Sequence, residues 1–342
     1  MSKFNFNAPI TDKTSYGLVA INIAARLDCD ILPIGQPSGN IPKSVIEKLN
    51  NTEEFDLNRP SVRLFHQFDL QTIGNNKQIG YTIFELDTFN RVEKAHLKSV
   101  DEIWVCSNWA KEVIKNNGIN SPVKVVPLGV DPTIFYPVEF QSEDYVFLSA
   151  GKWEIRKSQN EIVEAFNRAF HPTDKVQLWL SMHNAFLDTQ FIQRKRNDYI
   201  NTPMGKAGRI KFVGPFDKQA GIARIMNMAS CGVFPSKAEG WGLETLEMMA
   251  CGKPVIVTDY AGHKEYCNAD NSVLISTIGT ESAYDGKWFF NQGNWAKFDT
   301  QALIEAMRKQ FNMGHTVNKN GIKTAKKFSW DNTAETIRKL LE

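Results

Sequence analysis

Three cations follow a predicted buried strand at a glycine-containing turn. In the run LSAGKWEIRKSQNEIVEAF, the residues Lys152, Arg156 and Lys157 come before a helix that opens with the capping-box pattern Ser158-x-x-Glu161. Free backbone N–H groups and the positive end of a helix dipole meet at such a turn, which favours a phosphate or diphosphate ligand. The alternative is a solvated basic turn. A P-loop is excluded, because the pattern GxxxxGK followed by Ser or Thr is absent.

A second strand-turn-helix segment, FPSKAEGWGLETLEMMACGKPVIVTD, carries carboxylates in place of cations. Glu247 shares a helix face with Leu243 and Ala250, so we expect it to point inward, which is costly unless a partner hydrogen-bonds it. Glu239 precedes the turn, and the amides from Gly240 onward point to the same place. This combination favours a ligand that is both polyhydroxylated and anionic, such as a sugar nucleotide. The alternative is that the acids only interact favourably with the N-terminus of the helix, which would explain Glu239 but not the inward-facing Glu247.

Polar residues also follow two predicted strands of the first half. His66 closes the predicted strand 62–66, and Glu85 follows the predicted strand 79–84. Both would lie at carboxyl strand ends, although a lone His or Glu there is more often structural. His263, beside Glu265 in the turn YAGHKEY, has the same two interpretations.

Short apolar runs alternate with helix-period segments along most of the chain, which is typical of parallel β-α-β units. The first half has predicted strands at 3–7, 30–34, 62–66, 79–84, 102–107 and 123–127, with helices at 17–27 and 108–117. The second half has predicted strands at 145–150, 176–182, 210–213, 232–235 and 254–259, with helices at 158–170, 219–230 and 242–250.

Residues 131–144 contain two prolines and no sustained period, which indicates a linker. We therefore expect an α/β protein with two Rossmann-like, doubly wound parallel-sheet domains facing across a cleft: an N-terminal domain at 1–140, and a second, nucleotide-sugar-binding domain at 141–327. The ligand would lie at the carboxyl ends of the strands.

Composition excludes several classes of protein. The 342 residues are 42% hydrophobic and 23% charged, which is typical of a folded protein and too long for a single small module. The only G-x-G, Gly240-Trp241-Gly242, lacks the third glycine of a nicotinamide-binding fingerprint. The five scattered cysteines form no C-x-x-C pair, and neither a signal peptide nor a membrane span is apparent, so we expect a cytoplasmic location.

These segments resemble the retaining glycosyltransferases of family 4, also called group 1, which have the GT-B fold. EGWGLETLE (239–247) resembles the family's E-x7-E signature, and SAGKWEIRKSQNEIVEAF resembles its phosphate-binding turn and following helix. Weaker matches are DEIWVCSNWAKEVIKNNG, VVPLGVDPTIFYP and the closing helix FSWDNTAETIRKLLE (328–342), which would pack on the N-terminal domain. Three features depart from the family: Lys152 replaces its usual Arg, Ser158 replaces its usual glycine, and its Gly-rich first loop is reduced to KTSYGL around Gly17.

The resemblance implies a role for each candidate residue. Glu239 and His66 would be catalytic, Glu239 at the donor sugar and His66 at the acceptor, where Glu85 also lies. Glu247 would bind the ribose. Base-binding residues would be Val213, Gly214 and Phe216, and the diphosphate would contact Gly17, Gly151, Lys152, Arg156, Lys157, Trp241, Gly242, Leu243 and Glu244.

The implied reaction is a metal-independent, front-face transfer from a UDP- or GDP-linked sugar, with no further cofactor. The Asp28-Cys29-Asp30 triplet begins a predicted strand at its amino end, away from the expected site, which argues against a metal-binding role.

The acceptor is the least determined partner. Residues 1–140 carry a net charge of −2 and show no basic amphipathic helix, which favours a saccharide or other soluble acceptor over a lipid. Hydroxylated bases in DNA are an alternative, because the run from Arg194 to Lys211 has six cations and one acid, although such runs are usually solvated helix faces. A sugar-nucleotide epimerase or a non-catalytic sensor is a further alternative.

Overall fold

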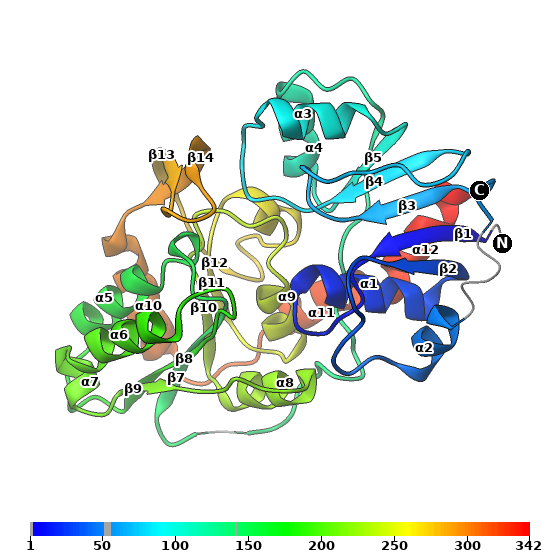
Figure 1. Cartoon of the computed structure of the whole chain (residues 1–342). Helices are drawn as coiled ribbons and strands as arrows, with labels where there is room; N and C mark the ends of the chain where they lie inside the picture. The colour runs from blue at the N-terminus through cyan, green and yellow to red at the C-terminus, as the bar shows by residue number, and fades with distance from the viewer. Residues whose placement is uncertain (1–2, 51–55, 141) are drawn as a thin grey trace. The chain divides into compact units, whose positions relative to one another are not determined.

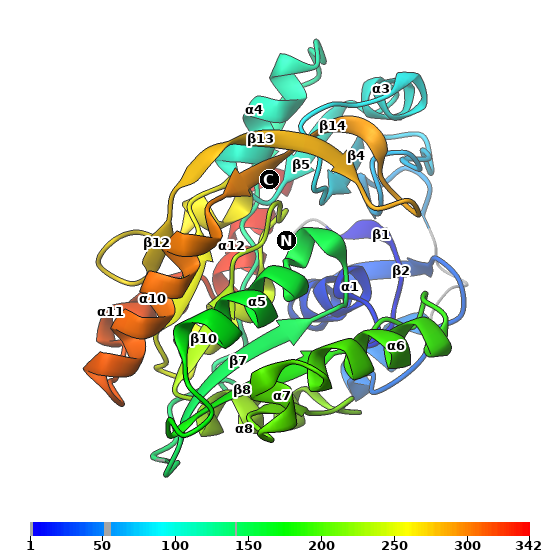
Figure 2. The ribbon, with the colours of Figure 1, turned by 90° about the vertical axis from the view of Figure 1, so that its left-hand side faces the viewer.

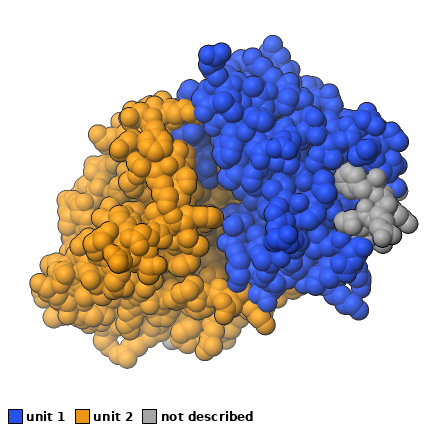
Figure 3. All heavy atoms as spheres, in the orientation of Figure 1, with its two compact units in different colours: residues 1–129, 328–342 blue, residues 130–327 orange. Residues whose placement is uncertain are grey.

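The computed structural model describes residues 3–50, 56–140 and 142–342. The chain divides into two compact units, coloured separately in Figure 3: unit 1 comprises Met1–Gly129 and Phe328–Glu342, and unit 2 comprises Val130–Lys327. The division falls at Gly129 rather than at residue 140. The cause is Asn227, whose side-chain amide donates to the Tyr136 carbonyl (3.1 Å) and whose Oδ1 accepts from the Val138 amide (2.8 Å), so this part of the linker belongs to unit 2.

Unit 1 is built on a parallel sheet with the strand order β2-β1-β3-β4-β5-β6 (Figure 1). Its core includes Ile103, Val105 and Ile114. The strands are β1 (Phe4–Ala8), β2 (Cys29–Pro33), β3 (Ser61–Leu64), β4 (Gln78–Thr82), β5 (Glu102–Val105) and β6 (Val123–Val125). The helices are α1 (Ser15–Arg26), α2 (Lys43–Leu49), α3 (Arg91–Lys98), α4 (Asn108–Asn116) and α12 (Trp330–Leu341).

Unit 2 repeats this design with the parallel order β12-β11-β10-β7-β8-β9. Its strands are β7 (Tyr145–Gly151), β8 (Val176–Met182), β9 (Ile210–Phe212), β10 (Cys231–Phe234), β11 (Val255–Thr258) and β12 (Val273–Ile275). Its helices are α5 (Gln159–Ala169), α6 (Thr189–Ile200), α7 (Pro203–Lys206), α8 (Gln219–Met228), α9 (Leu243–Ala250), α10 (Thr300–Met313) and α11 (Lys319–Lys327). Figure 1 shows α5, α6 and α10 on one face of this sheet and α8 and α9 on the other.

Central strands β7 and β10 are continuous buried runs, as expected when both faces of a parallel sheet are covered. Unit 2 adds two short 3-10 helices, η2 (Ile155–Lys157) and η3 (Ala261–Glu265), and an antiparallel hairpin of β13 (Thr277–Tyr284) and β14 (Phe290–Phe298), which Figure 2 shows as a long curved ribbon.

Two parallel-sheet α/β units were predicted, and they are confirmed. Several boundaries were wrong. β3 ends at Leu64 and β4 at Thr82, so His66 and Glu85 lie in the loops that follow these strands. The hairpin was not predicted, because consecutive residues of its strands are exposed. Its sequence therefore lacks the alternation of apolar and polar residues that marks a half-buried strand. Helices α2, α3, α6, α10 and α11 were also missed.

Candidate active site

Five charged side chains of unit 2 form one largely buried network. Nζ of Lys157 lies 2.8 Å from Oε1 of Glu239 and 3.0 Å from Oε1 of Glu244. The Arg156 guanidinium lies 3.1 Å from Oε2 of Glu239 and 2.6 Å from Oε2 of Glu154, and it also donates to the Ala238 carbonyl (2.9 Å). The structure thus brings together two of the three predicted cations and the predicted acids Glu239 and Glu244.

Neighbouring strands position this network. β7 leads through Gly151 to η2, which carries Arg156 and Lys157, and β10 leads through Glu239 to α9. These strands are paired in parallel, so their carboxyl ends lie at one edge of the sheet, where ligands of α/β proteins bind. The Lys237 amide donates to the Arg156 carbonyl (2.7 Å) and joins the two loops directly.

Burial and ion pairing oppose each other at these groups. Burial alone would raise the pKa of Glu239, but Lys157 and Arg156 outweigh it and hold that pKa well below its ordinary value. Burial alone would lower the pKa of Lys157, but Glu239 and Glu244 raise it above its ordinary value. Glu239 and Lys157 are therefore both charged at neutral pH.

Gly151 lies close against the network. Its φ is +128°, and a Cβ there would lie 2.8 Å from Oε1 of Glu244 and 3.4 Å from Nζ of Lys157. Any side chain would therefore collide with the Glu244 carboxylate and crowd the Lys157 ammonium, and glycine avoids both contacts.

Glu247 is buried on α9, as its place on the apolar face predicted. Burial is the main reason that its pKa rises to about 8, and the nearby Glu244 adds to the shift while Lys157 opposes it. Glu247 therefore holds its proton through most of the neutral range. A ligand that donates hydrogen bonds to it would favour the ionised form.

The start of α9 is supported by residues that sequence reasoning did not assign to the site. The hydroxyl of Tyr266 donates to the carbonyls of Gly242 (2.6 Å) and Trp241 (3.1 Å). Gly242 has a φ of +88°, and a Cβ on it would lie 2.5 Å from Nε2 of the buried His263. The turn YAGHKEY therefore fits against the turn EGWG. Leu243 opens α9.

The predicted capping box at α5 is wrong. Ser158 has φ +59° and ψ +34°, and α5 has no side-chain cap bond at this residue. An N-cap side chain reaches the helix amides from extended backbone, which this left-handed residue lacks. Glu161 pairs instead with Lys237, at 2.9 Å. The left-handed backbone also explains why a glycine is usual here in the family that the sequence resembles.

Lys152, the third predicted cation, lies apart from the network. Its ammonium lies 5.0 Å from the ring centroid of Phe186. Its contact with a diphosphate stays a prediction.

The predicted base-binding loop follows β9. The Val213 amide donates to the Leu180 carbonyl (3.1 Å), which continues the sheet, and the exposed Gly214 has a φ of +85°. The Phe216 ring packs against Gly214 and Gly221, where a Cβ would lie within 2.9 Å and 2.7 Å of ring atoms. Phe216 and Val213 are half-buried.

In unit 1, His66 lies in an aromatic cluster. Its ring stacks on Phe68 (centroids 5.0 Å apart, planes at 5°) and lies 4.6 Å from the Tyr16 ring. Tyr16, which sequence reasoning missed, donates its hydroxyl to the Ile83 carbonyl (2.5 Å), and the Glu85 charge acts on it as well. The structure therefore brings His66 near the segment that carries Glu85.

Gly17 lies in the first turn of α1, where a Cβ would come within 2.1 Å of the Thr11 carbonyl oxygen. Asp30, the second residue of β2, forms an ion pair with Lys3 (2.6 Å) and a contact with Arg59. In the part of the chain that the structure describes, no helix has the length and apolar character needed to cross a membrane.

The basic run 194–211 does not form one solvated face. Lys195 lies over Trp153 (5.8 Å) and Arg196 over Phe212 (5.2 Å). Arg209 pairs with Asp144 at 3.2 Å. Three of its six cations thus contact other side chains of unit 2: Lys195 and Arg196 from α6, and Arg209 from the loop before β9.

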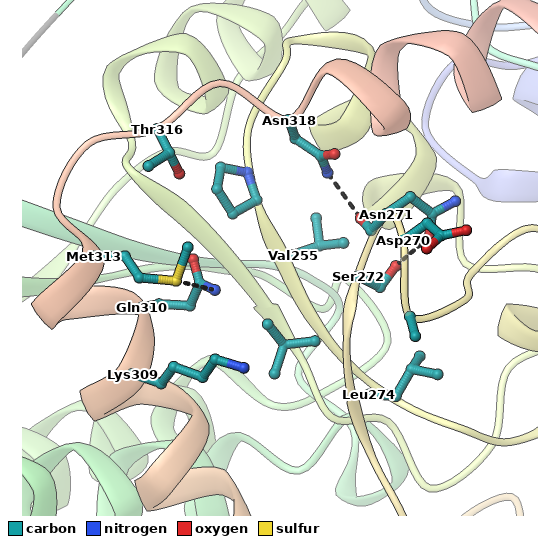
Figure 4. A pocket seen from close by; sticks show the side chains of 13 residues that line it. Val255, Asp270, Asn271, Ser272, Leu274, Lys309, Gln310, Met313, Thr316 and Asn318 are labelled. Atoms are coloured by element: carbon teal, nitrogen blue, oxygen red, sulfur yellow. Dashed lines mark hydrogen bonds between the residues drawn. The ribbon is translucent and has the colours of Figure 1, made fainter.

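A separate pocket of about 470 Å³ lies beside β12 and α10 and contains none of the predicted site residues (Figure 4). Its lining includes Asn271, Gln310 and Met313, and the Asn318 side chain donates to the Asn271 carbonyl (2.8 Å).

Two parallel-sheet α/β units of this kind are the defining feature of the GT-B fold, and the protein has this fold. The sucrose-phosphate synthase of Thermosynechococcus elongatus superposes with a TM-score of 0.72 at 16% identity, over 99% of this chain and 98% of that one. HepE of Anabaena, solved in complex with UDP and glucose, superposes with a TM-score of 0.73 at 17% identity, over 100% and 99%.

Residues 144–284 match the family model "Glycosyl transferases group 1". The putative glycosyltransferase EpsD of Bacillus subtilis is 22% identical over 66% of this chain and 57% of its own length. D-inositol 3-phosphate glycosyltransferase of Mycobacterium leprae is 25% identical over 39% of this chain and 28% of its own length. The matched part of this chain thus covers 57% of the length of the first of these curated relatives and 28% of the length of the second.

Proposed function

We propose that this protein is a retaining glycosyltransferase of family 4 that transfers a sugar from a nucleoside-diphosphate donor to an acceptor hydroxyl. The family match at 144–284 includes the turn 151–157 and the segment 239–247, which hold most of the predicted donor-binding residues. HepE was solved with UDP-glucose, so a UDP-linked hexose is the first donor to test. We also propose a cytoplasmic location, because all five cysteines are free and buried.

One observation carries the proposal: Lys157 is a cation with a side chain only 12% exposed, held between two carboxylates and next to Gly151, which has no side chain. Glu244, with its side chain 26% exposed, is the carboxylate that a donor diphosphate would displace. Lys157, Arg156 and the amides at the start of α9 would then stabilise the negative charge on the leaving diphosphate. Each such donor contributes about 2–4 kcal/mol to a transition state.

In the proposed reaction, the bond between the sugar C1 and the diphosphate oxygen breaks, and the acceptor oxygen bonds to C1 from the same face. The acceptor proton passes to the departing phosphate oxygen, so neither a protein nucleophile nor a metal is required. Glu239 would hold donor-sugar hydroxyls and Glu247 the ribose hydroxyls. His66 and Glu85 would serve the acceptor, for which a saccharide or other soluble molecule is favoured.

The test begins with thermal shifts against UDP- and GDP-sugars, because a ligand at 100 times its Kd stabilises the fold by about 2.7 kcal/mol. Variants then separate the roles. Glu239→Ala is expected to lower the rate of sugar transfer, to acceptor or to water, by ~100-fold or more while UDP still binds. Glu247→Ala is expected to raise the Kd for UDP by ~10-fold in calorimetry.

Glu164→Ala, on the exposed side of α5, is the matched control and should change neither quantity. Turnover that persists in Glu239→Ala would overturn the site assignment. UDP-sugar binding without transfer in the wild type would favour a sensor, and conversion of the donor sugar itself would favour an epimerase. Equal rates in EDTA and in Mg²⁺ are expected.

A further inference from the structure

Unit 2 displays four large aromatic side chains to solvent near the tip of the β13–β14 hairpin. Phe186, Tyr284, Trp288 and Phe290 are 56%, 53%, 43% and 62% exposed, and we call them the aromatic rim. Single exposed apolar residues need no explanation, but several gathered on one element mark an interaction surface.

The rim is held in a defined conformation. Oδ1 of Asp285 accepts the amide N–H groups of Lys287 (2.8 Å), Trp288 (2.8 Å) and Phe289 (2.9 Å), which orders the turn. Tyr284 and Phe290 lie directly opposite each other across the strands, with ring centroids 6.4 Å apart. A surface ordered in advance loses little conformational entropy when a ligand binds.

The hairpin is joined to the candidate donor site at its base. The Ala296 amide donates to the Lys237 carbonyl (2.8 Å), and the Lys237 ammonium pairs with Glu281 of β13 (2.7 Å). Lys237 also bonds through its amide to Arg156 and stands two residues before Glu239. The base of the hairpin therefore rests on the loop that carries the predicted catalytic carboxylate.

A second connection runs from the tip. Lys287 donates to the Phe186 carbonyl and lies 4.8 Å from the Trp288 ring centroid. On the other side of Phe186, Lys152 lies 5.0 Å from the ring centroid, and Lys152 directly follows Gly151 of the donor site. Rim and donor site are thus parts of one continuous stretch of unit 2.

The charge of the hairpin restricts what this surface binds. Residues 277–298 contain two acids and two lysines, so their net charge is zero. Glu281, Asp285 and Lys287 are all engaged within the protein. Anionic lipids and nucleic acids are bound through clustered uncompensated cations, which this segment lacks.

We propose that the aromatic rim is a binding site for a neutral saccharide, and that it holds the non-reacting part of the acceptor chain. A pyranose ring is amphipathic: its C–H face packs on an aromatic ring, and its hydroxyls stay hydrated or bond to polar neighbours such as the exposed Ser282. The assignment as an acceptor subsite rests on the proposed glycosyltransferase function. Saccharide binding by the aromatic rim does not depend on that function.

The experiment uses the full chain and the variants Trp288→Ala and Tyr284→Ser/Phe290→Ser. Trp288→Phe retains a ring, and Val317→Ser removes an equally exposed apolar side chain elsewhere in unit 2. Binding is measured on an array of neutral oligosaccharides and by saturation-transfer NMR with maltohexaose and N-acetylchitotetraose. Kd for UDP and the rate of donor hydrolysis without acceptor are measured in parallel.

We expect the wild type and Val317→Ser to bind neutral saccharides equally. Each rim variant should bind about tenfold more weakly, Trp288→Phe should retain most of the affinity, and UDP binding and donor hydrolysis should stay unchanged. The proposal is overturned if no neutral saccharide binds or if rim variants bind normally. It is also overturned if the rim variants instead lose self-association in sedimentation or binding to phosphatidylserine vesicles. Absence of donor binding and hydrolysis in the wild type would refute the proposed function alone.

Discussion

Lys157 is a cation with a side chain only 12% exposed, and the protein's own carboxylates keep it ionised. Two carboxylates compensate it, and Arg156 shares one of them. Removing a single partner from such a buried network is costly because it leaves another charge unpaired. Replacing an internal carboxylate by a ligand phosphate keeps the charges compensated. The network is therefore suited to exchange one anion for another.

Glu247 has a consequence for stability that can be measured without any ligand. Its pKa is raised from an ordinary value of 4.5 to about 8, so the unfolded chain loses the proton at lower pH than the folded chain does. The stabilising effect of the retained proton is complete below the unfolded pKa and is lost as pH rises toward 8. As pH rises from 5 to 8.5, the free energy of unfolding of Glu247→Gln should increase relative to that of the wild type by on the order of 3 kcal/mol.

Urea unfolding of both proteins at the two pH values checks this expectation. The isosteric amide cannot ionise, and all other titrating groups are common to both chains. A stability difference that does not change with pH would contradict the burial of an ionisable Glu247.

At the scale of elements, the β7–η2–α5 connection depends on one residue in the left-handed region. Ser158 is fully buried with φ +59°, and within the described residues its hydroxyl has no hydrogen-bond partner. A left-handed backbone costs an L residue about 1–2 kcal/mol, and a buried unpaired hydroxyl adds to that cost. The element that presents Lys157 is therefore built with strain.

Ser158→Gly should relieve this strain. The gain is reduced by the greater freedom of glycine in the unfolded chain, so we expect a net stabilisation of about 0.5–1 kcal/mol. Ser158→Ala removes the hydroxyl but keeps the Cβ, and should gain less than the glycine variant. Thermal unfolding ranks the three proteins. A glycine variant less stable than the wild type would show that the left-handed conformation is not the source of strain.

At the scale of the whole molecule, the two units are not consecutive in sequence: the C-terminal helix α12 follows unit 2 along the chain but belongs to unit 1. Trp330 and Ile337 of α12 are buried, the Thr333 hydroxyl donates to the Pro127 carbonyl (2.8 Å), and Arg26 pairs with Asp331 (2.7 Å). A Cβ on Gly129 would meet the Trp330 amide nitrogen at 2.2 Å, so the helix start lies against this glycine.

A chain truncated after Lys327 should therefore lose unit 1 and keep unit 2. Loss of the buried side chains of α12 removes several kcal/mol from a unit whose stability is about 5–15 kcal/mol. Calorimetric unfolding should show the unit 1 transition lowered or absent, while UDP binding persists because most of the predicted donor-binding residues lie in unit 2. Loss of both transitions together would contradict two separately cooperative units.

Much of the architecture was predictable because it is encoded locally. The strand 176–182 alternates buried apolar residues with half-buried ones, and the strand at Tyr145 and the helix at Leu243 are delimited by Gly, Pro and polar residues close in sequence. The same holds for the segments 151–157 and 239–247, whose spacing relative to strand and helix ends alone predicted an anion site with inward-facing carboxylates.

Only the tertiary structure decided which of these side chains meet. Lys157 and Glu239 are far apart in the chain and come together because β7 and β10 are neighbours, while Lys152 in the same turn is directed toward Phe186. The left-handed Ser158, the supporting Tyr266 and the aromatic hairpin likewise depend on partners distant in sequence. Periodicity and turn residues report what each segment buries, whereas the partner of a side chain is determined by strand order and packing, which no local pattern contains.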